Sequence, residues 1–476
     1  MLETSLRQKL ISIVGEAHFK DSQEALVSHS YDATPLYQAM PDGVIFPGNK
    51  EEVAEILKVA SEHRIPIIGR GAGSNLCGGT VPVHGGIVMV MNRMNKLLEI
   101  DMDNLTATFQ PGLITKDFHQ EVEKHGLFYP PDPGSMSVST LGGNIMENAG
   151  GLRGLKYGTT KDYVIGLEAV LPSGEMIRTG GKLYKDVAGY DLTKLLVGSE
   201  GTLAIITEAT VKLLPAPKVK KTMIAMYRDI YAAARTVSLI VGNRIIPATL
   251  EFIDNATLRV VEEYNKLGLP VDMDAILLIE QDGMDMAVVD KDIEQIIRIC
   301  EQEGAVEVRL AQNAEEADRL MQARRGALST LARIRPTTFQ EDATVPRSKI
   351  ADMVTQINRI AQKYNLQICT FGHAGDGNLH PTCATDARDK EEIQRVIQAY
   401  EDIFAAAIEL GGTITGEHGV GLLKAPYLEW KVGAIGIDIM KGIKRVFDPH
   451  NILNPGKIFP DEPRKRKVAD HDSTVS

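Results

Sequence analysis

The residues of this chain best suited to chemistry are histidines in two glycine-rich stretches. Three of its 11 histidines lie there, two in residues 371–380 (F-G-H-A-G-D-G-N-L-H) and one in residues 415–419 (T-G-E-H-G). Asp376-Gly377 is a strong turn signal, and a chain reversal there would bring His373 and His380 together. Two histidines and a carboxylate suit a divalent transition metal and leave coordination positions open. Any one of these histidines can instead be an ordinary hydrogen-bonded loop residue, but as a set, without apolar bulk around them, they favour a site.

A second stretch with chemical potential follows a short apolar strand at residues 65–68. Its residues are small or polar: Arg70, Gly71, Ala72, Gly73, Ser74 and Asn75. Small side chains let the backbone approach a ligand, and successive N–H groups can bind an anion. The guanidinium of an arginine can add charged hydrogen bonds to a phosphate. Leu76 stands where the dinucleotide fingerprint G-x-G-x-x-G needs its third glycine, and no helix-forming run follows, which argues against a Rossmann turn. Alone, this loop is equally consistent with a tight turn at the edge of a sheet.

The loop is the first member of an ordered series of glycines and small polar residues. The later members are Pro131, Asp132, Gly134, Ser135, Gly142, Gly143, Asn144, Gly150, Gly151, Tyr157, Gly158, Glu200, Gly201 and Ile206. From about residue 41 to 215, this order and spacing resemble the flavin-binding domain of the vanillyl-alcohol oxidase / para-cresol methylhydroxylase family. The resemblance implies that the series binds FAD, and that the segment 447–457, which includes Asn454, returns to the flavin domain. We expect non-covalent FAD, because residues 72–75 hold no histidine, and the nearby Cys77 can simply be packed.

The histidine pattern H-x-G-D-G-N-x-H followed by G-E-H-G resembles one branch of that family, the (R)-2-hydroxy acid dehydrogenases. This branch includes D-lactate dehydrogenases, the glycolate oxidase D subunit and D-2-hydroxyglutarate dehydrogenase. The resemblance implies that His373, His380 and Glu417 are metal ligands. It also implies that His418 is the catalytic base and that Arg324 binds the substrate carboxylate.

The implied mechanism is chemically coherent. A metal chelated by the carboxylate and hydroxyl of a 2-hydroxy acid lowers the pKa of that hydroxyl, and a histidine can accept the proton at neutral pH. The hydrogen on carbon then leaves as hydride to the flavin, which carries the redox chemistry. The metal is expected to be Zn, Fe or Mn.

Three positions depart from the relatives. Gln340 stands where a lysine is expected in the hydroxyglutarate enzymes, and Met321 stands where many relatives have tryptophan. A second substrate carboxylate therefore lacks an obvious partner, which favours a small monocarboxylate. Ala204 replaces a usual glycine and places a methyl group near the flavin.

We therefore predict oxidation of D-lactate to pyruvate. The alternative among enzymes is a glycolate oxidase D-type subunit of a multi-subunit complex. From other classes, a non-catalytic electron-shuttling flavoprotein would need neither metal nor base, and a flavin-free metal-dependent hydrolase would leave the glycine series without a role.

Composition restricts the class of protein further. The chain has 476 residues, 43% of them hydrophobic, and a net charge of −11, which argues against general affinity for nucleic acid or anionic lipid. Its 4 cysteines contain no C-x-x-C pair, which argues against an iron–sulfur cluster and a disulfide framework. Electrons should therefore pass to an external protein, with an electron-transfer flavoprotein ranked first. The sequence shows neither a signal peptide nor an apolar run of membrane-spanning length, so we expect a cytoplasmic protein.

The pattern of elements predicts an α+β fold with a boundary near residues 215–217. We expect a FAD-binding domain of two α+β subdomains over 1–217. By the family resemblance, residues 218–424 form a cap domain that carries the metal site, with an antiparallel sheet covered by helices. Residues 425–460 return to the FAD domain, and 461–476 form a disordered tail.

Individual elements follow from periodicity and capping signals. Asn49, with Glu52 three residues later, predicts a capped helix whose apolar face is Val53, Ile56, Leu57 and Ala60. Another helix is expected over 115–125, ending at Gly126. In the second half, one helix is expected to end at about residue 241, two are expected over 287–303 and 314–334, and another is expected after Pro346. Strands are expected at 44–47, 86–91, 97–101, 106–110, 164–171, 175–179, 222–227, 249–253, 275–280 and 305–310.

Overall fold

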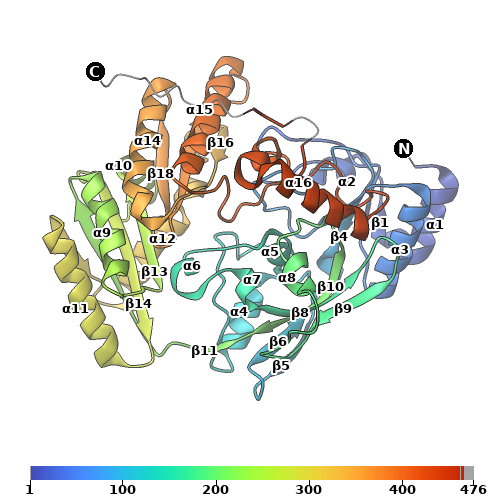
Figure 1. Ribbon diagram of the computed structural model, residues 1–476, viewed down its shortest axis with the longest axis horizontal. Helices are drawn as coiled ribbons and strands as arrows, with labels where there is room; N and C mark the ends of the chain where they lie inside the picture. The colour runs from blue at the N-terminus through green and yellow to red at the C-terminus, as the bar shows by residue number, and fades with distance from the viewer. Residues whose placement is uncertain (1, 461–462, 466–476) are drawn as a thin grey trace.

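The computed structural model describes residues 2–460 and 463–465. Figure 1 shows two lobes: the N-terminal half of the chain forms one, and the segment that follows β11 forms the other. The last long helix, α16, returns to the first lobe. We call the first the FAD lobe and the second the cap.

The FAD lobe begins with a small, largely parallel sheet in the order β1-β2-β4-β3. Its strands are β1 (Phe19–Lys20), β2 (Gly43–Ile45), β3 (Ile67–Arg70) and β4 (Ile87–Val90), and its helices are α1 (Thr4–Val14), α2 (Gln23–Ser28) and α3 (Lys50–His63). Helix α3 confirms the capping prediction, because the Asn49 side chain accepts a hydrogen bond from the N–H of Glu52 at 2.8 Å. The Glu52 carboxylate reaches back one residue further than the usual capping box and accepts from the N–H of Gly48.

A second, antiparallel sheet completes the FAD lobe in the order β5-β6-β10-β8-β9. Its strands are β5 (Leu97–Asp101), β6 (Thr106–Phe109), β8 (Val164–Val170), β9 (Met176–Gly180) and β10 (Ile205–Lys212); a separate pair joins β7 (Leu127–Phe128) to β11 (Leu214–Pro215). Its helices are α4 (Thr115–Glu123), α5 (Leu141–Glu147), α6 (Gly154–Tyr157), α7 (Thr160–Tyr163) and α8 (Leu192–Leu196). Helix α5 lies inside the glycine series and was not predicted.

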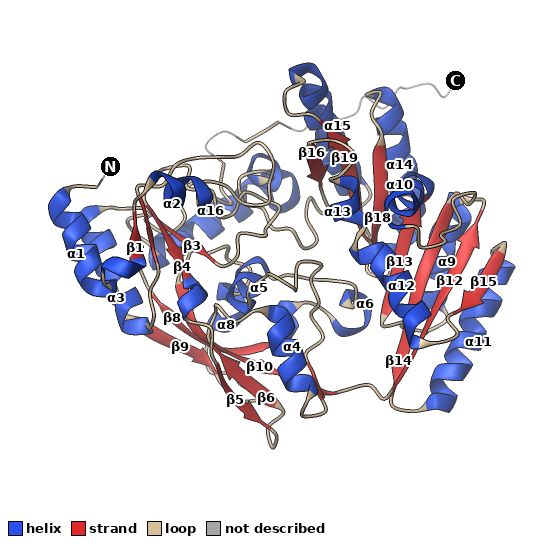
Figure 2. Ribbon diagram, turned by 180° about the vertical axis from the view of Figure 1, so that it is seen from behind, coloured by secondary structure: helices blue, strands red, loops and turns tan. Residues whose placement is uncertain are grey.

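The cap is built on one antiparallel sheet in the order β15-β12-β14-β13-β18-β19-β16, with β17 paired to β19. The strands are β12 (Val219–Tyr227), β13 (Thr249–Asp254), β14 (Ala275–Gly283), β15 (Glu307–Leu310), β16 (Thr337–Gln340), β17 (Ala343–Thr344), β18 (Ile368–His373) and β19 (Asn378–Thr385). Both faces of this sheet are covered by helices, as Figures 1 and 2 show from opposite sides.

Two groups of helices cover the two faces of the cap sheet. One apolar core joins the sheet to α9 (Ile230–Gly242), α11 (Met286–Gln302), α14 (Ile350–Lys363) and α15 (Lys390–Glu409). The other joins it to α10 (Asn255–Asn265), α12 (Ala314–Arg325) and α13 (Ala327–Leu331). The single helix predicted over 314–334 is thus two helices that meet at Gly326. Helices α10 and α15 were not predicted.

The chain then returns to the FAD lobe through α16 (Leu428–Phe447), which is interrupted at Gly433 with φ 71°. Beyond it, Leu453 pairs with Ile67 of β3 in a parallel bridge. The buried Lys444 ammonium donates to the carbonyls of Thr202 and Leu453, at 2.8 Å each, and so ties α16 to the lobe.

The predicted α+β class is therefore confirmed, with largely antiparallel sheets. The predicted domain boundaries remain a proposal. The predicted tail, 461–476, lies outside the described residues except for 463–465.

Candidate active site

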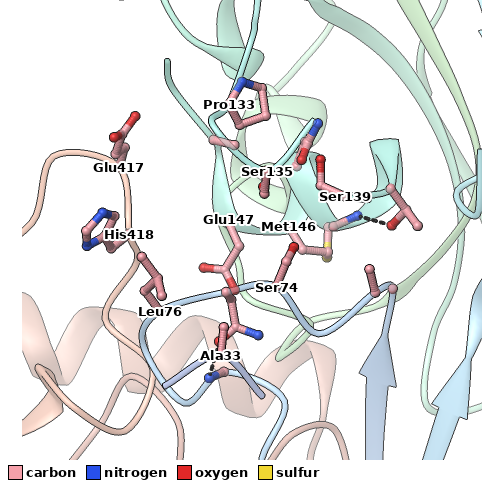
Figure 3. A pocket seen from close by; sticks show the side chains of 18 of the residues that line it. Ala33, Ser74, Leu76, Pro133, Ser135, Ser139, Met146, Glu147, Glu417 and His418 are labelled. Atoms are coloured by element: carbon pink, nitrogen blue, oxygen red, sulfur yellow. Dashed lines mark hydrogen bonds between the residues drawn. The ribbon is translucent and has the colours of Figure 1, made fainter. Parts of the chain in front are cut away.

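One cavity of about 540 Å³ lies between the FAD lobe and the cap. Figure 3 shows side chains from three parts of the chain around it: Ser74 and Leu76 of the glycine loop, Glu147 of α5, and Glu417 and His418. Its walls thus combine the phosphate-type loop with the histidine stretches, although almost 300 residues or more separate them in the sequence.

The glycine loop after β3 forms part of the cavity wall. Gly73 has φ +70°, and a side chain there would overlap the guanidinium of Arg70. Arg70 itself donates through Nη1 to the carbonyl of Tyr31 at 2.8 Å and to Thr80 at 3.2 Å. The arginine predicted to contact a phosphate therefore also holds the loop in shape, and the loop needs glycine at position 73.

Helix α5 forms a second part of the wall. Thr140 caps it by accepting from the N–H of Gly143 at 3.2 Å, and a side chain at Gly142 would overlap Pro111. Both glycines line the cavity. The helix can therefore lie close to the neighbouring loop while its first turn faces the cavity.

Most of the predicted cofactor residues line this cavity. They are Arg70, Gly71, Ala72, Gly73, Ser74, Asn75, Gly134, Ser135, Gly142, Gly143, Asn144, Gly150, Glu200, Gly201 and Ile206. The remaining ones do not: Pro131, Asp132, Gly151, Tyr157, Gly158 and Asn454. Asn454 supports the wall from behind, because its Nδ2 donates to the carbonyls of Gly79 and Glu200, which line the cavity. The Tyr157 hydroxyl donates to Asp282 of the cap and so joins the two lobes.

His373, His380 and Glu417 converge on the cap side of the cavity. His373 is the last residue of β18 and His380 is the third residue of β19. The two strands pair with His373 opposite Asn378, which confirms the predicted chain reversal. Both Nε2 atoms approach the same oxygen of Glu417, at 3.1 and 3.2 Å. Ligand atoms of all three lie within 4.8 Å of one another. This donor set fits a divalent transition metal.

A buried carboxylate behind this group orients it. Glu251 of β13, whose side chain is fully buried, approaches Nδ1 of His373 at 2.8 Å and pairs with Nε of Arg324. The proton of a neutral His373 therefore sits on Nδ1, and Nε2 is left free for a metal. Burial lowers the pKa of His373, but Glu251 and Glu417 outweigh it and raise that pKa well above its usual value, so a metal at Nε2 would displace a proton from that atom.

Arg324 lies against the ring of Phe371, 4.8 Å from its centroid, and lines the cavity. Its Nη2 is buried and has no hydrogen-bond partner in the part of the chain that the structure describes. Because Nε is held by Glu251, the guanidinium is fixed in place and can offer this remaining edge to a carboxylate.

His418 stacks on His380, with ring centroids 5.1 Å apart and planes 9° apart. Its Nδ1 lies 3.7 Å from Asp342. The pKa of His418 is lowered to about 4 by burial, which the charge of Asp342 only partly offsets. The imidazole is therefore neutral at pH 7 and can accept a proton.

Asp342 organises the loop that carries Glu417 and His418. One of its oxygens accepts from the N–H groups of Gly416, Glu417 and His418, at 2.6, 2.7 and 3.2 Å, and the other pairs with the buried Lys424. Burial alone would raise the pKa of Asp342, yet Lys424 keeps it lowered. A permanently ionised carboxylate thus fixes the loop.

Comparisons with known proteins identify the family. Residues 41–180 match the family described as FAD binding domain, and residues 216–458 match FAD linked oxidases, C-terminal domain. The chain belongs to the FAD-linked oxidases. The predicted family and the FAD cofactor are confirmed.

Related FAD-linked oxidases are found over the whole chain. The glycolate oxidase subunit GlcD of Bacillus subtilis is 62% identical over 99% of this chain and 100% of its own length. A D-lactate dehydrogenase of Archaeoglobus fulgidus is 38% identical over 87% of this chain and 90% of its own. Among solved structures, p-cresol methylhydroxylase with substrate bound has a TM-score of 0.80 at 17% identity, covers 96% of each chain, and shares the fold. The activity of this FAD-linked oxidase is therefore oxidation of a hydroxy acid.

The structure also places the three positions that are predicted to depart from the relatives. Gln340 lines the cavity and leaves its Oε1 buried without a partner among the described residues. Ala204 lines it too. Met321 is buried in the apolar core between the cap sheet and α12, away from the cavity wall.

Sequence reasoning missed Glu251, Asp342 and Lys424. No motif surrounds them, and only tertiary packing brings them to the histidines. Among the residues that the structure describes, no helix has both the length and the apolar character needed to cross a membrane.

Proposed function

We propose that this FAD-linked oxidase oxidises a small 2-hydroxy monocarboxylate with the help of a divalent metal. D-lactate, oxidised to pyruvate, is the first candidate. Glycolate is the second, and the 62% identity to a protein named glycolate oxidase subunit is the observation in its favour. One observation carries the proposal: the His373, His380 and Glu417 group faces the glycine-walled FAD cradle across a single cavity.

The residues of the chain divide the work between binding and proton transfer. FAD, when bound, supplies hydride acceptance, and a metal on the histidine group supplies Lewis acidity toward the substrate hydroxyl. Arg324 binds the carboxylate through its unpartnered edge. His418, held neutral beside the metal group, accepts the hydroxyl proton.

The cavity wall supports a monocarboxylate. Gln340 is uncharged at a place on the cavity wall where a second carboxylate would need a cation. D-2-hydroxyglutarate should therefore be a poor substrate. D-lactate has a methyl group, and glycolate a second hydrogen, where D-2-hydroxyglutarate carries its longer acidic chain, so neither of these substrates needs a second cation.

We further propose that a protein accepts the electrons, with an electron-transfer flavoprotein ranked first. The word subunit in the names of the GlcD relatives supports a protein partner, and equally supports a D-type subunit of a larger complex. The alternative from another class of protein is a non-catalytic electron shuttle. That function would not explain the ordered group of Glu251, His373 and His418.

Anaerobic stopped-flow reduction of the FAD-loaded protein tests the activity. D-lactate or glycolate should bleach the flavin absorbance, whereas L-lactate should not, and D-2-hydroxyglutarate should do so slowly. After removal of the metal by chelation, substrate should no longer reduce the flavin while dithionite still does, because that route needs no hydroxyl deprotonation. Full-rate reduction by substrate in metal-free, FAD-loaded protein would defeat the metal-assisted mechanism.

A variant separates the metal from the cofactor. His380→Ala should lower the metal content and substrate-driven reduction while FAD stays bound. His63→Ala, at the end of α3 and outside the cavity, is the matched control and should retain all three properties. Equal metal content in both variants would contradict the assigned ligands.

A further inference from the structure

Helix α16 exposes an apolar stripe on the side opposite its buried face. After the break at Gly433 it runs to Phe447, and Ile435, Ile439 and Val446 are 78%, 61% and 81% exposed. Ile437 and Lys444 form its buried side. Figure 1 shows α16 on the near side of the molecule, with no element drawn in front of it. Three large exposed aliphatic side chains in one row are typical of a surface that meets a partner.

The spacing of the stripe is that of a coiled-coil seam. Ile435, Ile439, Gly442 and Val446 follow one another at intervals of four, three and four residues, which is the a/d repeat of a heptad. Gly442 is a gap within that row, since a side chain built there would meet no atom within 4 Å. The row therefore offers two ridges with an open notch between them.

This row is complementary to itself when a second α16 runs antiparallel to it. If Ile439 of one helix fills the notch at Gly442 of the other, the same register sets Ile435 opposite Val446. Both pairs are centred between residues 440 and 441, so one two-fold axis satisfies them at once. Such a match between a surface and its own copy is the requirement for an isologous interface.

The charges beside the stripe fit the same arrangement. Asp438 and Arg445 are seven residues apart, so they lie on the same flank of the helix. Antiparallel pairing brings like flanks together, which places Asp438 near Arg445 of the second copy, twice per pair. Within the described chain neither residue has an ion-pair partner of its own.

We propose that this protein forms a two-fold homodimer in which α16 packs antiparallel against α16 of a second copy. The occupant of the stripe is a second copy because apolar register and flanking charge are both self-complementary. The helix from residue 434 to 447 is about 21 Å long, which is the length over which the two copies can pack. This assembly is independent of the substrate proposed above.

Sedimentation velocity of the FAD-loaded full chain tests the dimer. The wild type should sediment as a dimer at micromolar concentration. Ile439→Asp should raise the dissociation constant by about tenfold or more, as loss of a central packed contact does. Val288→Asp changes an aliphatic side chain of α11 that is 59% exposed, and this control should leave the dimer intact.

Cysteine pairing tests the register itself. A mixture of Ile435→Cys and Val446→Cys proteins should form a disulfide-linked dimer under mild oxidation. Either variant alone should not, because its two cysteines would lie about 16 Å apart along the antiparallel pair. The native cysteines are all buried and should not compete.

Exchanging the charges of Asp438 and Arg445 tests the proposed ion pairs beside the stripe. Asp438→Arg should weaken the dimer, and addition of Arg445→Asp in the same chain should restore it. A wild type that stays monomeric at 100 µM would overturn the proposal, as would a dimer insensitive to Ile439→Asp or a failure of the mixed disulfide. A wild type that is monomeric yet binds vesicles of anionic phospholipid through this stripe would assign the surface to a membrane instead. None of these outcomes bears on flavin reduction by hydroxy acids, so the two proposals fail separately.

Discussion

Replacing Glu251 by glutamine should weaken metal binding without touching the FAD site. In the native protein both carboxylate oxygens are used, one toward Nε of Arg324 and one toward Nδ1 of His373. Glutamine keeps one oxygen, which will stay on the charged Arg324. Its amide nitrogen then faces His373 and needs an acceptor there, so the imidazole proton moves to Nε2. A protonated Nε2 cannot bind a metal.

The size of the effect follows from what is lost. A carboxylate that fixes the tautomer of a ligating histidine contributes about 10–100-fold in metal affinity, and we expect a loss in that range for Glu251→Gln. The substitution also leaves Arg324 as a buried cation without its counter-charge, which should lower the stability of the cap by roughly 3 kcal/mol. FAD content should not change, because Glu251 does not line the cavity.

Metal titration with Zn²⁺ and Mn²⁺ against a competing chelator measures this loss, with metal counted by mass spectrometry and FAD by its absorbance. Glu280→Gln is the matched control: it lies on the adjacent strand β14, opposite Thr249, and should bind metal like the wild type. Wild-type metal affinity in a folded Glu251→Gln protein would refute the idea that Glu251 sets the tautomer of His373.

Three further substitutions test other parts of the structure. Gly73→Val should abolish FAD uptake, measured by absorbance after incubation with FAD, because a branched side chain at φ +70° would displace Arg70 and fill the loop. His418→Ala should keep both metal and FAD but slow anaerobic flavin reduction by about 10²–10⁴-fold, and an unchanged rate would remove His418 as the base. Burial lowers the pKa of His119 in the folded protein to about 4, below its unfolded value near 6.5, so the unfolded state binds more protons and stability falls as the pH drops through that window. Between pH 7.5 and 5 this group should cost about 2 kcal/mol in urea unfolding, and His119→Gln should lose less stability than the wild type over the same interval.

The parts of the fold that the sequence predicted were those set by local signals. The capped helix α3 needs only Asn49 and an apolar face at helical spacing, and the β18–β19 reversal needs only Asp376-Gly377. Helix α5 was not predicted, because each glycine within it costs about 1 kcal/mol in helix propensity. Close packing of Gly142 on Pro111, which no local pattern contains, favours the helix.

In the candidate site, too, the sequence predicted the residues that carry a local signal and missed those that do not. The histidine stretches carry their own spacing, and the structure places His373, His380, Glu417 and His418 together as a group. Glu251 has no such signal, because it lies 73 residues from Arg324 and 122 residues from His373. Its role depends on the order of strands in the cap sheet, which is a property of the assembled fold and not of any one segment.

The bridge between Ile67 and Leu453 has a consequence for how the protein is made. The FAD lobe is completed by a segment that is synthesised long after β3, since Asn454 must reach the carbonyls of Gly79 and Glu200. About 380 residues separate the two partners, and translation at ~5–20 residues per second takes roughly 20–75 s to span them. During that interval the edge of β3 is unpaired on this side, while the whole cap is already available to fold. The residues of the histidine cluster are therefore synthesised before the flavin cradle can close, and the segment that carries Leu453 and Asn454 is needed to complete it.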